Sequence, residues 1–410
     1  MADSFSFTSP SDAGYFDTSS HIQPLFPQAT VHLAMSTLTE IFGGGNNAYF
    51  SNGHINRLAF LRTQNALLDA ASTHRSAKYL TFDELNALRT EDGKFAFLSY
   101  EDLETVLGRP YAQDEKTQVH DFDPSKHYPT LIFLGLDLEG PSSEQVRIGD
   151  YSGTPYFALD VSPIRYTALK DKLASSGKTH TPARIDLSLS HADSAILSHA
   201  RSLLDWNARN RFCSSCGGRT LSTHGGAKVI CPPADAGKPR PTACATRVGL
   251  HNQAFPRTDP TVIIAPISAD SKRVLLGRGK RWPANYFSCL SGFVEPGESL
   301  EVATRREAYE ETGVRIGRVQ LHSSQPWPYP STLLIGAMGQ CEEGGEGITY
   351  PETELEEARW FEMGEVEHAL ENGANAIWEP PVKGYSGPRV PPRQLMAHQV
   401  LRGVLRLFHR

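Results

Sequence analysis

Long apolar runs are missing from this sequence of 410 residues. A membrane-spanning helix needs about 18 or more consecutive apolar residues. The longest apolar stretches, 131–138 and 262–267, are much shorter. The start of the chain also lacks the basic and apolar segments of a secretory signal and the Arg-rich pattern of a mitochondrial presequence. We therefore expect neither a membrane protein nor an exported one.

Cysteine is scarce, and basic residues are not in excess. Six cysteines are too few for a disulfide framework in a chain of this length, and their clustering suggests a metal site in a reducing compartment. The net charge is -6 and the pI is about 6.2. A chain with this balance is not built to coat nucleic acid over its whole surface, although a local basic patch is compatible with it.

The length predicts two or three folded units, because domains usually contain about 100 to 200 residues. Residues 1–28 are rich in Ser, Pro and Asp and have no periodicity, so we expect a mobile tail. Short strands separated by turns predict a mixed α/β (α+β) domain over 29–190, followed by a linking segment over 191–258. A third domain, 259–410, alternates strands with helices.

Two helices in these domains have clear boundaries. Apolar residues at helical spacing predict a helix that starts after Ser190, as the N-cap, and ends near Arg209. A second helix is predicted over 300–312, after a Gly-rich loop. The first helix leads into the cysteine cluster, and the second carries most of the carboxylates discussed next.

Three carboxylates lie on one face of the second predicted helix. With 3.6 residues per turn, Glu307, Glu310 and Glu311 occupy positions i, i+3 and i+4 beside Arg306. Like charges this close repel one another, and a hard divalent cation such as Mg²⁺ would explain them. An isolated group of glutamates is usually only solvated helix surface, so the wider context has to decide.

That context is a segment, 292–314, that resembles the Nudix box, a loop-helix-loop motif that binds metal and diphosphate. One position departs from the motif, because Ala308 stands where a larger aliphatic residue is usual. The resemblance implies a Nudix α/β/α sandwich for 259–410 and a Nudix-like domain without a box for 29–190. Seven fixed positions of the motif match: Gly292, Glu298, Arg306, Glu307, Glu310, Glu311 and Gly313.

The resemblance also implies roles at this site. Glu307 and Glu311 would be the main ligands of Mg²⁺ or Mn²⁺, and Glu310 would be a further ligand or the general base. We expect Glu311 to face solvent and metal rather than the core. Three further residues complete the implied site. Arg306 would pair with Glu298 to brace the loop, and Ser291 would offer a backbone carbonyl to the metal.

Aromatic residues and prolines alternate in Ser324-Gln-Pro-Trp-Pro-Tyr-Pro-Ser331. Alternating prolines predict an extended rod that presents a stacking ring at little entropic cost. The run could instead be a proline-rich ligand for an aromatic groove on a partner. It is similar to an array in the NADH pyrophosphatase branch of Nudix hydrolases, with Tyr329 in place of Phe.

Members of that branch cleave NADH or NAD⁺ to nicotinamide mononucleotide and AMP, and the same chemistry can remove an NAD cap from the 5′ end of RNA. No G-x-G-x-x-G turn supports an oxidoreductase instead, so the dinucleotide is expected as a substrate. The resemblance assigns an additional metal carboxylate to Glu354. It assigns substrate contacts to Phe255, Phe293, Gln325, Trp327, Tyr329, Ser331, Thr332 and Ala397.

The branch also suggests an assembly and a location. Its members are commonly homodimers, and some are peroxisomal. This sequence ends Leu407-Phe-His-Arg410 rather than in S-K-L, so we expect a cytoplasmic protein.

Cys213 and Cys216 have the C-x-x-C spacing with which two thiolates grip one zinc ion, and Cys231 and Cys244 could complete a tetrahedral site. A redox pair is the alternative for C-x-x-C, and His224 is the alternative fourth ligand. The NADH pyrophosphatase branch carries a four-cysteine zinc ribbon just before its catalytic domain, which favours structural zinc. A non-catalytic zinc-ribbon protein that binds nucleotide or RNA is the competing class of function.

The ribbon segment, 209–257, is locally basic. Asp235 is its only acidic residue. This charge could be plain solvated surface, or it could guide a polyphosphate or RNA. The eight basic residues are Arg209, Arg211, Arg219, Lys228, Lys238, Arg240, Arg247 and Arg257.

Overall fold

The computed structural model describes residues 48–51, 53–139, 145–182, 185–240, 243–247 and 254–408. The expected mobile tail, 1–28, lies outside these residues. Within the described part of the chain, no helix combines the length and the apolar character needed to cross a membrane.

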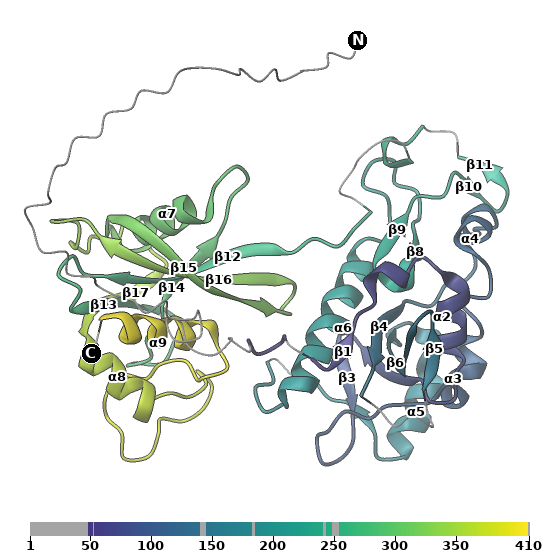
Figure 1. The fold of residues 1–410 in the computed structure, drawn as a ribbon, viewed down its shortest axis with the longest axis horizontal. Coiled ribbons are helices and arrows are strands. Elements are labelled where there is room, and N and C mark those ends of the chain that lie inside the picture. The colour runs from purple at the N-terminus through teal and green to yellow at the C-terminus, as the bar shows by residue number, and fades with distance from the viewer. Residues whose placement is uncertain are drawn as a thin grey trace, which may run out of the picture. The chain divides into compact units, whose positions relative to one another are not determined.

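The first domain is built on a seven-stranded mixed sheet in the order β1-β4-β6-β2-β3-β7, with β5 paired to β6 (Figure 1). The strands are β1 (Ile55–Asn56), β2 (Lys78–Asp83), β3 (Asn86–Arg89), β4 (Leu131–Asp137), β5 (Val146–Ile148), β6 (Tyr151–Asp160) and β7 (Thr179–His180). The helices are α2 (Asn65–Ser72), α3 (Tyr100–Leu107), α4 (Glu115–His120), α5 (Thr167–Ser175) and α6 (His191–Arg209).

Central strands of this sheet are buried on both faces, as their sequences predict. Six of the seven residues of β4 are buried, which suits a continuous apolar run covered on both sides. The helix predicted to follow Ser190 is α6, and the Ser190 side chain caps it by accepting a hydrogen bond from the Asp193 amide at 3.0 Å. Its apolar residues join the same core as the sheet.

The segment after α6 has little regular structure. Two short antiparallel pairs form it, and 3-10 turns lie at His224–Gly226 and Ala245–Arg247. The strands are β8 (Leu221–Thr223), β9 (Lys228–Ile230), β10 (Ala234–Asp235) and β11 (Lys238–Pro239).

The last domain has a six-stranded sheet in the order β15-β16-β12-β13-β17, with β14 paired to β12. The central pair, β12 and β16, is parallel, whereas the other pairs are antiparallel. The strands are β12 (Asp259–Ile267), β13 (Arg273–Gly279), β14 (Leu290–Phe293), β15 (Ile316–Trp327), β16 (Thr332–Cys341) and β17 (Leu355–Glu362). The helices are α7 (Leu300–Thr312), α8 (Met363–Asn372) and α9 (Met396–Phe408).

Alternate residues of β12 pack into two separate cores, because successive side chains of a strand point to opposite faces. Val262 and Ile264 pack in the core that includes α7. Ala265 and Ile267 lie on the opposite face of the strand and pack in the core that includes α8 and α9. Figure 1 shows α7 on one side of the sheet and α8 and α9 on the other. The predicted α/β/α sandwich is therefore confirmed, and α7 begins and ends at the predicted residues.

Candidate active site

The carboxylates that the sequence placed on one helix face lie on α7. Ser299 caps the helix by accepting a hydrogen bond from the Val302 amide at 3.3 Å. Gly313 ends it in the left-handed region, with φ at 76°, a conformation that glycine adopts at little cost. The helix is therefore fixed at both ends, and Glu307, Glu310 and Glu311 keep a defined position against β14.

Arg306 holds the loop and the helix together. It donates two hydrogen bonds to the Glu298 carboxylate, at 2.7 and 2.9 Å, and one to the Phe293 carbonyl at 2.8 Å. The implied pair of Glu298 and Arg306 is thus present. The same guanidinium bonds Glu307 and Glu310, each at 2.8 Å. One cation thereby offsets part of the repulsion among the carboxylates.

Glu311 is the exception among these carboxylates, because no cation among the described residues pairs with it. Its side chain is buried, with 4% of its surface exposed, so the expectation that it faces solvent is wrong. One carboxylate oxygen accepts a long hydrogen bond from the Ser291 amide at 3.4 Å, and the other has no partner among the described residues. Burial first, and then the charges of Glu354 and Glu307, raise the pKa of Glu311 to about 8.

A buried carboxylate with an unpaired oxygen is costly unless a cation compensates it. A divalent cation bound to Glu311 would satisfy the free oxygen and lower the pKa again. Glu352, which the sequence reasoning missed, adds to the negative charge here and also raises the pKa of Glu307, after burial. The donor set, which is all oxygen, fits a hard ion such as Mg²⁺.

Gly292 is required by the position of Glu307. A Cβ atom at residue 292 would lie 1.8 Å from the Glu307 carboxyl carbon and about as close to both its oxygens. No side chain fits in that space, so the first glycine of the box lets β14 approach the carboxylate of α7 directly.

A cavity of about 410 Å³ opens beside the helix. Ser291, Glu311 and Glu354 line it, so the structure brings three of the implied metal residues to one space. The cavity is large enough for part of a small-molecule ligand. The loop after β13 supplies three further lining residues that the sequence reasoning did not single out: Lys280, Arg281 and Trp282.

Two rings implied to stack on the substrate, Phe255 and Phe293, are more than half exposed. Neither lines the cavity, although Phe293 ends the strand on which Ser291 lies. Ala397 is buried in α9, and its carbonyl accepts a hydrogen bond from the Cys289 thiol at 3.7 Å. Cys289 lines the cavity. Ala397 therefore contacts a lining residue but does not line the cavity itself.

The proline and aromatic run is not an extended rod, and that expectation is wrong. Trp327 ends β15 and pairs with Thr332, which begins the antiparallel strand β16. The chain therefore reverses between these two residues, because the hydrogen bonds of the hairpin outweigh the extended preference of the prolines. We call residues 325–332 the aromatic hairpin.

Side chains of the aromatic hairpin are mostly engaged. The Gln325 amide donates to the carbonyls of Tyr49 and Gln394, at 3.2 and 2.7 Å, and its side chain is buried. Ser331 and Thr332 are buried too. The Ser331 hydroxyl donates to the carbonyl of residue 257 at 3.5 Å. None of these three residues lines the cavity.

Trp327 and Tyr329 are half-buried and pack edge to face, with 5.3 Å between ring centroids. Phe50 packs edge-on against both rings. Arg201 of α6 lies over Tyr329 and donates to the carbonyl of Pro328 at 2.9 Å. The rings are thus held as a cluster rather than displayed singly.

The four cysteines come together, with all their Sγ atoms within 4.8 Å of one another. Their Sγ atoms lie closest in two pairs, Cys213 with Cys244 and Cys216 with Cys231, each at 3.5 Å. The ribbon therefore forms a four-cysteine cluster that could hold a zinc ion.

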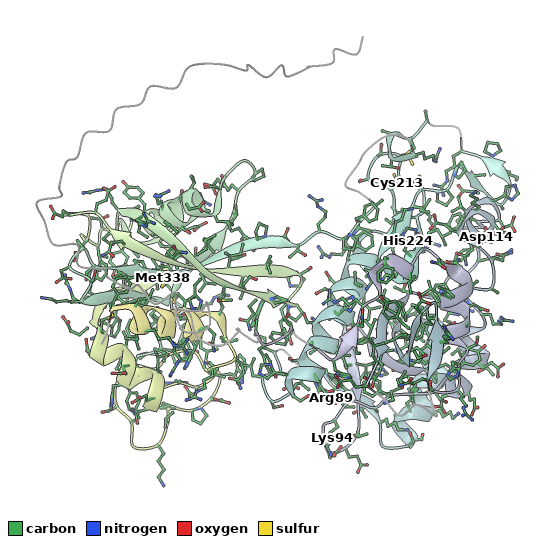
Figure 2. The ribbon with its side chains drawn as sticks, in the orientation of Figure 1. Arg89, Lys94, Asp114, Cys213, His224 and Met338 are labelled. Carbon is green, nitrogen blue, oxygen red and sulfur yellow. The ribbon has the colours of Figure 1, made fainter. Side chains whose placement is uncertain are left out.

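His224 is not part of this cluster. Its Nε2 atom lies 2.8 Å from the Glu115 carboxylate of α4, and Figure 2 shows it apart from Cys213. The alternative of His224 as the fourth ligand is therefore wrong. His224 is held by Glu115, whereas the four cysteines contact one another elsewhere in the ribbon.

Several basic residues of the ribbon have structural partners. Arg240 pairs with Asp235, and both Arg240 and Arg247 donate to the Cys231 sulfur at 3.4 Å. Such hydrogen bonds orient and stabilise a thiolate ligand. The remaining pairs are Arg209 with Asp205 and Lys228 with Glu115. Arg211, Lys238 and Arg257 are exposed.

Comparison with known proteins identifies the architecture. Residues 257–379 match the NUDIX domain, and residues 56–206 match the NADH pyrophosphatase-like rudimentary NUDIX domain. A relative from Schizosaccharomyces pombe, named NAD-capped RNA hydrolase, is 35% identical over 330 residues, which are 79% of this chain and 85% of the relative. This chain belongs to the Nudix hydrolase family.

Other members of the family align over larger and smaller parts of this chain. A human NAD-capped RNA hydrolase is 33% identical over 88% of this chain and 73% of its own length. A bacterial NAD-capped RNA hydrolase from Stutzerimonas stutzeri is 32% identical over 55% of this chain and 72% of its own length. The two matched domains of this Nudix protein flank the four-cysteine cluster, in the order that the sequence predicts.

Proposed function

We propose that this protein hydrolyses the diphosphate bond of NADH or NAD⁺ to nicotinamide mononucleotide and AMP, with Mg²⁺ or Mn²⁺ as cofactor. The observation that carries the proposal is Glu311, a buried carboxylate with one unpaired oxygen, which lines a cavity together with Ser291 and Glu354. Glu307, Glu311, Glu354 and the Ser291 carbonyl are the proposed ligands, and Glu310 is a further ligand or the general base. A divalent ion bound there would neutralise the diphosphate and acidify a water molecule.

The remaining chemistry falls to the residues of the chain. The attacking water adds its oxygen to one phosphorus atom, the bridging oxygen leaves with the other, and the proton of the water goes to a base. Glu310 is the candidate for that base, since its side chain is 39% exposed and that of Glu307, the other α7 carboxylate bound by Arg306, is 13% exposed. Arg306 positions it through the hydrogen bond at 2.8 Å.

RNA that carries a 5′ NAD cap is the second candidate substrate. The names of the relatives from Schizosaccharomyces pombe and from human support it. The reacting diphosphate is the same in both cases, so the site itself serves either substrate. The proposal also includes structural zinc in the four-cysteine cluster and a homodimer in the cytoplasm, as expected from the sequence.

A turnover assay on NADH tests the proposal. The purified protein should release nicotinamide mononucleotide and AMP in the presence of Mg²⁺ or Mn²⁺, and removal of the ion by EDTA should abolish the reaction. A preparation that binds NADH without hydrolysing it would instead support the non-catalytic binding protein. Sedimentation of the same sample measures whether it is a dimer.

A further inference from the structure

The loop after β13 carries two cations that the Nudix box does not explain. Lys280 and Arg281 are exposed, and both line the cavity that Glu311 also lines. Within the described residues, neither side chain has a carboxylate partner. Arg278, two residues earlier, behaves differently and pairs with Glu357 at 3.4 Å. The two cations are therefore available to a ligand in the cavity.

The turn that carries these cations is well fixed. The Trp282 amide donates a hydrogen bond to the Gly279 carbonyl at 2.9 Å. The indole of Trp282 lies against Gly279, where an added Cβ would meet the ring at 3.4 Å, and packs edge-on against Tyr286. Because Trp282 anchors the turn, the backbone at Lys280 and Arg281 has a fixed position beside the cavity.

The charges on the cavity walls are complementary to one kind of ligand. Glu311 and Glu354, where a divalent ion is proposed, line the same cavity as the two cations. A ligand that binds both must present several anionic oxygens over a short distance, as a diphosphate does. A neutral sugar or base would leave both cations without a partner.

We propose that Lys280 and Arg281 bind the diphosphate oxygens of the dinucleotide in this cavity. This inference rests on the function proposed above and adds two substrate-binding residues to it. The cations bind the diphosphate rather than the phosphates of an RNA body, because they line the cavity of Glu311 itself. In this arrangement, the chain neutralises substrate charge that the metal ion alone does not offset.

The test compares Lys280→Ala, Arg281→Ala and the double variant with the wild-type protein. Two exposed cations of the same domain that do not line the cavity supply matched controls, Lys383→Ala and Arg318→Ala. The kinetic constants for NADH are measured at saturating Mg²⁺, together with the Mg²⁺ concentration for half-maximal activity. Equilibrium binding of NADH is measured without turnover, in the absence of added divalent ions.

Each single substitution should raise KM for NADH roughly 10-fold, the scale of one lost charge-assisted hydrogen bond. The kcat should change little, because the contact is made in the ground state and in the transition state alike. The Mg²⁺ requirement should not change, and both controls should behave as wild type. Arg281→Lys should recover part of the lost affinity, which a merely structural role would not predict.

The alternatives give different results. Wild-type kinetics in the double variant would overturn the proposal. If the double variant lost activity on NAD-capped RNA but kept normal activity on NADH, the proposal would also be overturned. The two cations would then be assigned to binding of the RNA body. If the wild-type protein binds NADH without turnover, the proposed function fails. The role of the two cations is then decided by comparing the NADH affinity of the variants with that of the wild type. If it neither binds nor hydrolyses NADH, both proposals fail.

Discussion

Glu311 shows how a single buried carboxylate can mark a catalytic site. Its position on the helix follows from the sequence, but its burial arises from the packing of α7 against β14. A carboxylate in that environment favours its protonated form until a cation approaches. The free oxygen and the raised pKa therefore point to the same missing partner, a metal ion.

Glu311→Gln tests this assignment at the residue scale. We expect turnover of NADH to fall by about 10²-fold or more, as for other lost metal ligands. The metal-free variant should be at least as stable as the metal-free wild type, because an amide replaces a buried acid without its cost of ionisation. Thermal unfolding with and without Mg²⁺ measures this, and Mg²⁺ should stabilise the wild type more. Near-normal turnover would contradict the metal assignment.

Gly292→Ala should disturb Glu307 in particular. The added methyl group overlaps the carboxylate, so either the side chain of Glu307 or strand β14 must move. We expect a large loss of turnover and a weaker dependence on Mg²⁺, with the folded state retained as judged by circular dichroism. Gly297→Ala is a control in the same loop, since no atom lies within 4 Å of a Cβ there, although its positive φ adds some strain. Equal losses in both variants would argue for general loop disruption instead.

Among the elements, we expect the ribbon to depend on its four-cysteine cluster for stability. Its strands are two or three residues long, so it buries little apolar surface of its own. Two arginines donate to one cysteine sulfur, which is favourable when that sulfur is a thiolate bound to metal.

Cys213→Ser should release the bound zinc and destabilise the ribbon. Metal analysis of the purified wild-type protein should find about one zinc ion per chain, as expected for a four-thiolate site, and the variant should contain much less. Ser215→Ala, in the same C-x-x-C turn, removes no thiolate and should retain zinc. Wild-type protein without zinc would contradict the proposal.

The aromatic hairpin is the second element with a testable role. Trp327→Ala should weaken binding of NADH by about 1 to 3 kcal/mol, the scale of one stacking contact, and should leave the Mg²⁺ requirement unchanged. Phe50→Ala removes a ring that packs on Trp327 but keeps the indole itself. If Phe50→Ala weakened binding as much, the position of the hairpin rather than stacking would explain the loss. Titration of the variants with NADH measures both.

At the scale of the whole molecule, a long substrate such as RNA would extend beyond the cavity and contact other surfaces of the protein. Charge on the ribbon offers one path for RNA, but Arg240 and Arg247 are committed to Asp235 and Cys231. Reversing their charge would therefore disturb the cluster. The exposed residues Arg211, Lys238 and Arg257 are better probes.

Cleavage of NAD-capped RNA should fall with rising salt more steeply than cleavage of free NADH. Each phosphate contact with a single strand contributes a slope of about −0.7 in the logarithmic plot. Charge reversal at the three exposed residues should slow the RNA reaction and spare NADH, whereas Arg318→Glu should affect neither. Equal effects on both substrates, or none, would reject a path over the ribbon.

What the sequence determined by itself was local structure and motifs of fixed spacing. Helix α7, the carboxylate positions on it and the C-x-x-C turn all involve residues close together in the chain, and the resemblance to the Nudix box implied the pair of Glu298 and Arg306. Local geometry and capping fix such features before any long-range contact forms. The continuous apolar run of β12 likewise suits a strand that is buried on both faces.

Only the tertiary structure decided what depends on residues far apart in the chain. It buried Glu311, joined His224 to Glu115, turned the aromatic run into a hairpin and placed Lys280 and Arg281 on the cavity of Glu311. These outcomes depend on which surfaces pack together. Packing sets the burial of Glu311 and the partners of these charged residues, and their spacing in the sequence does not reveal either.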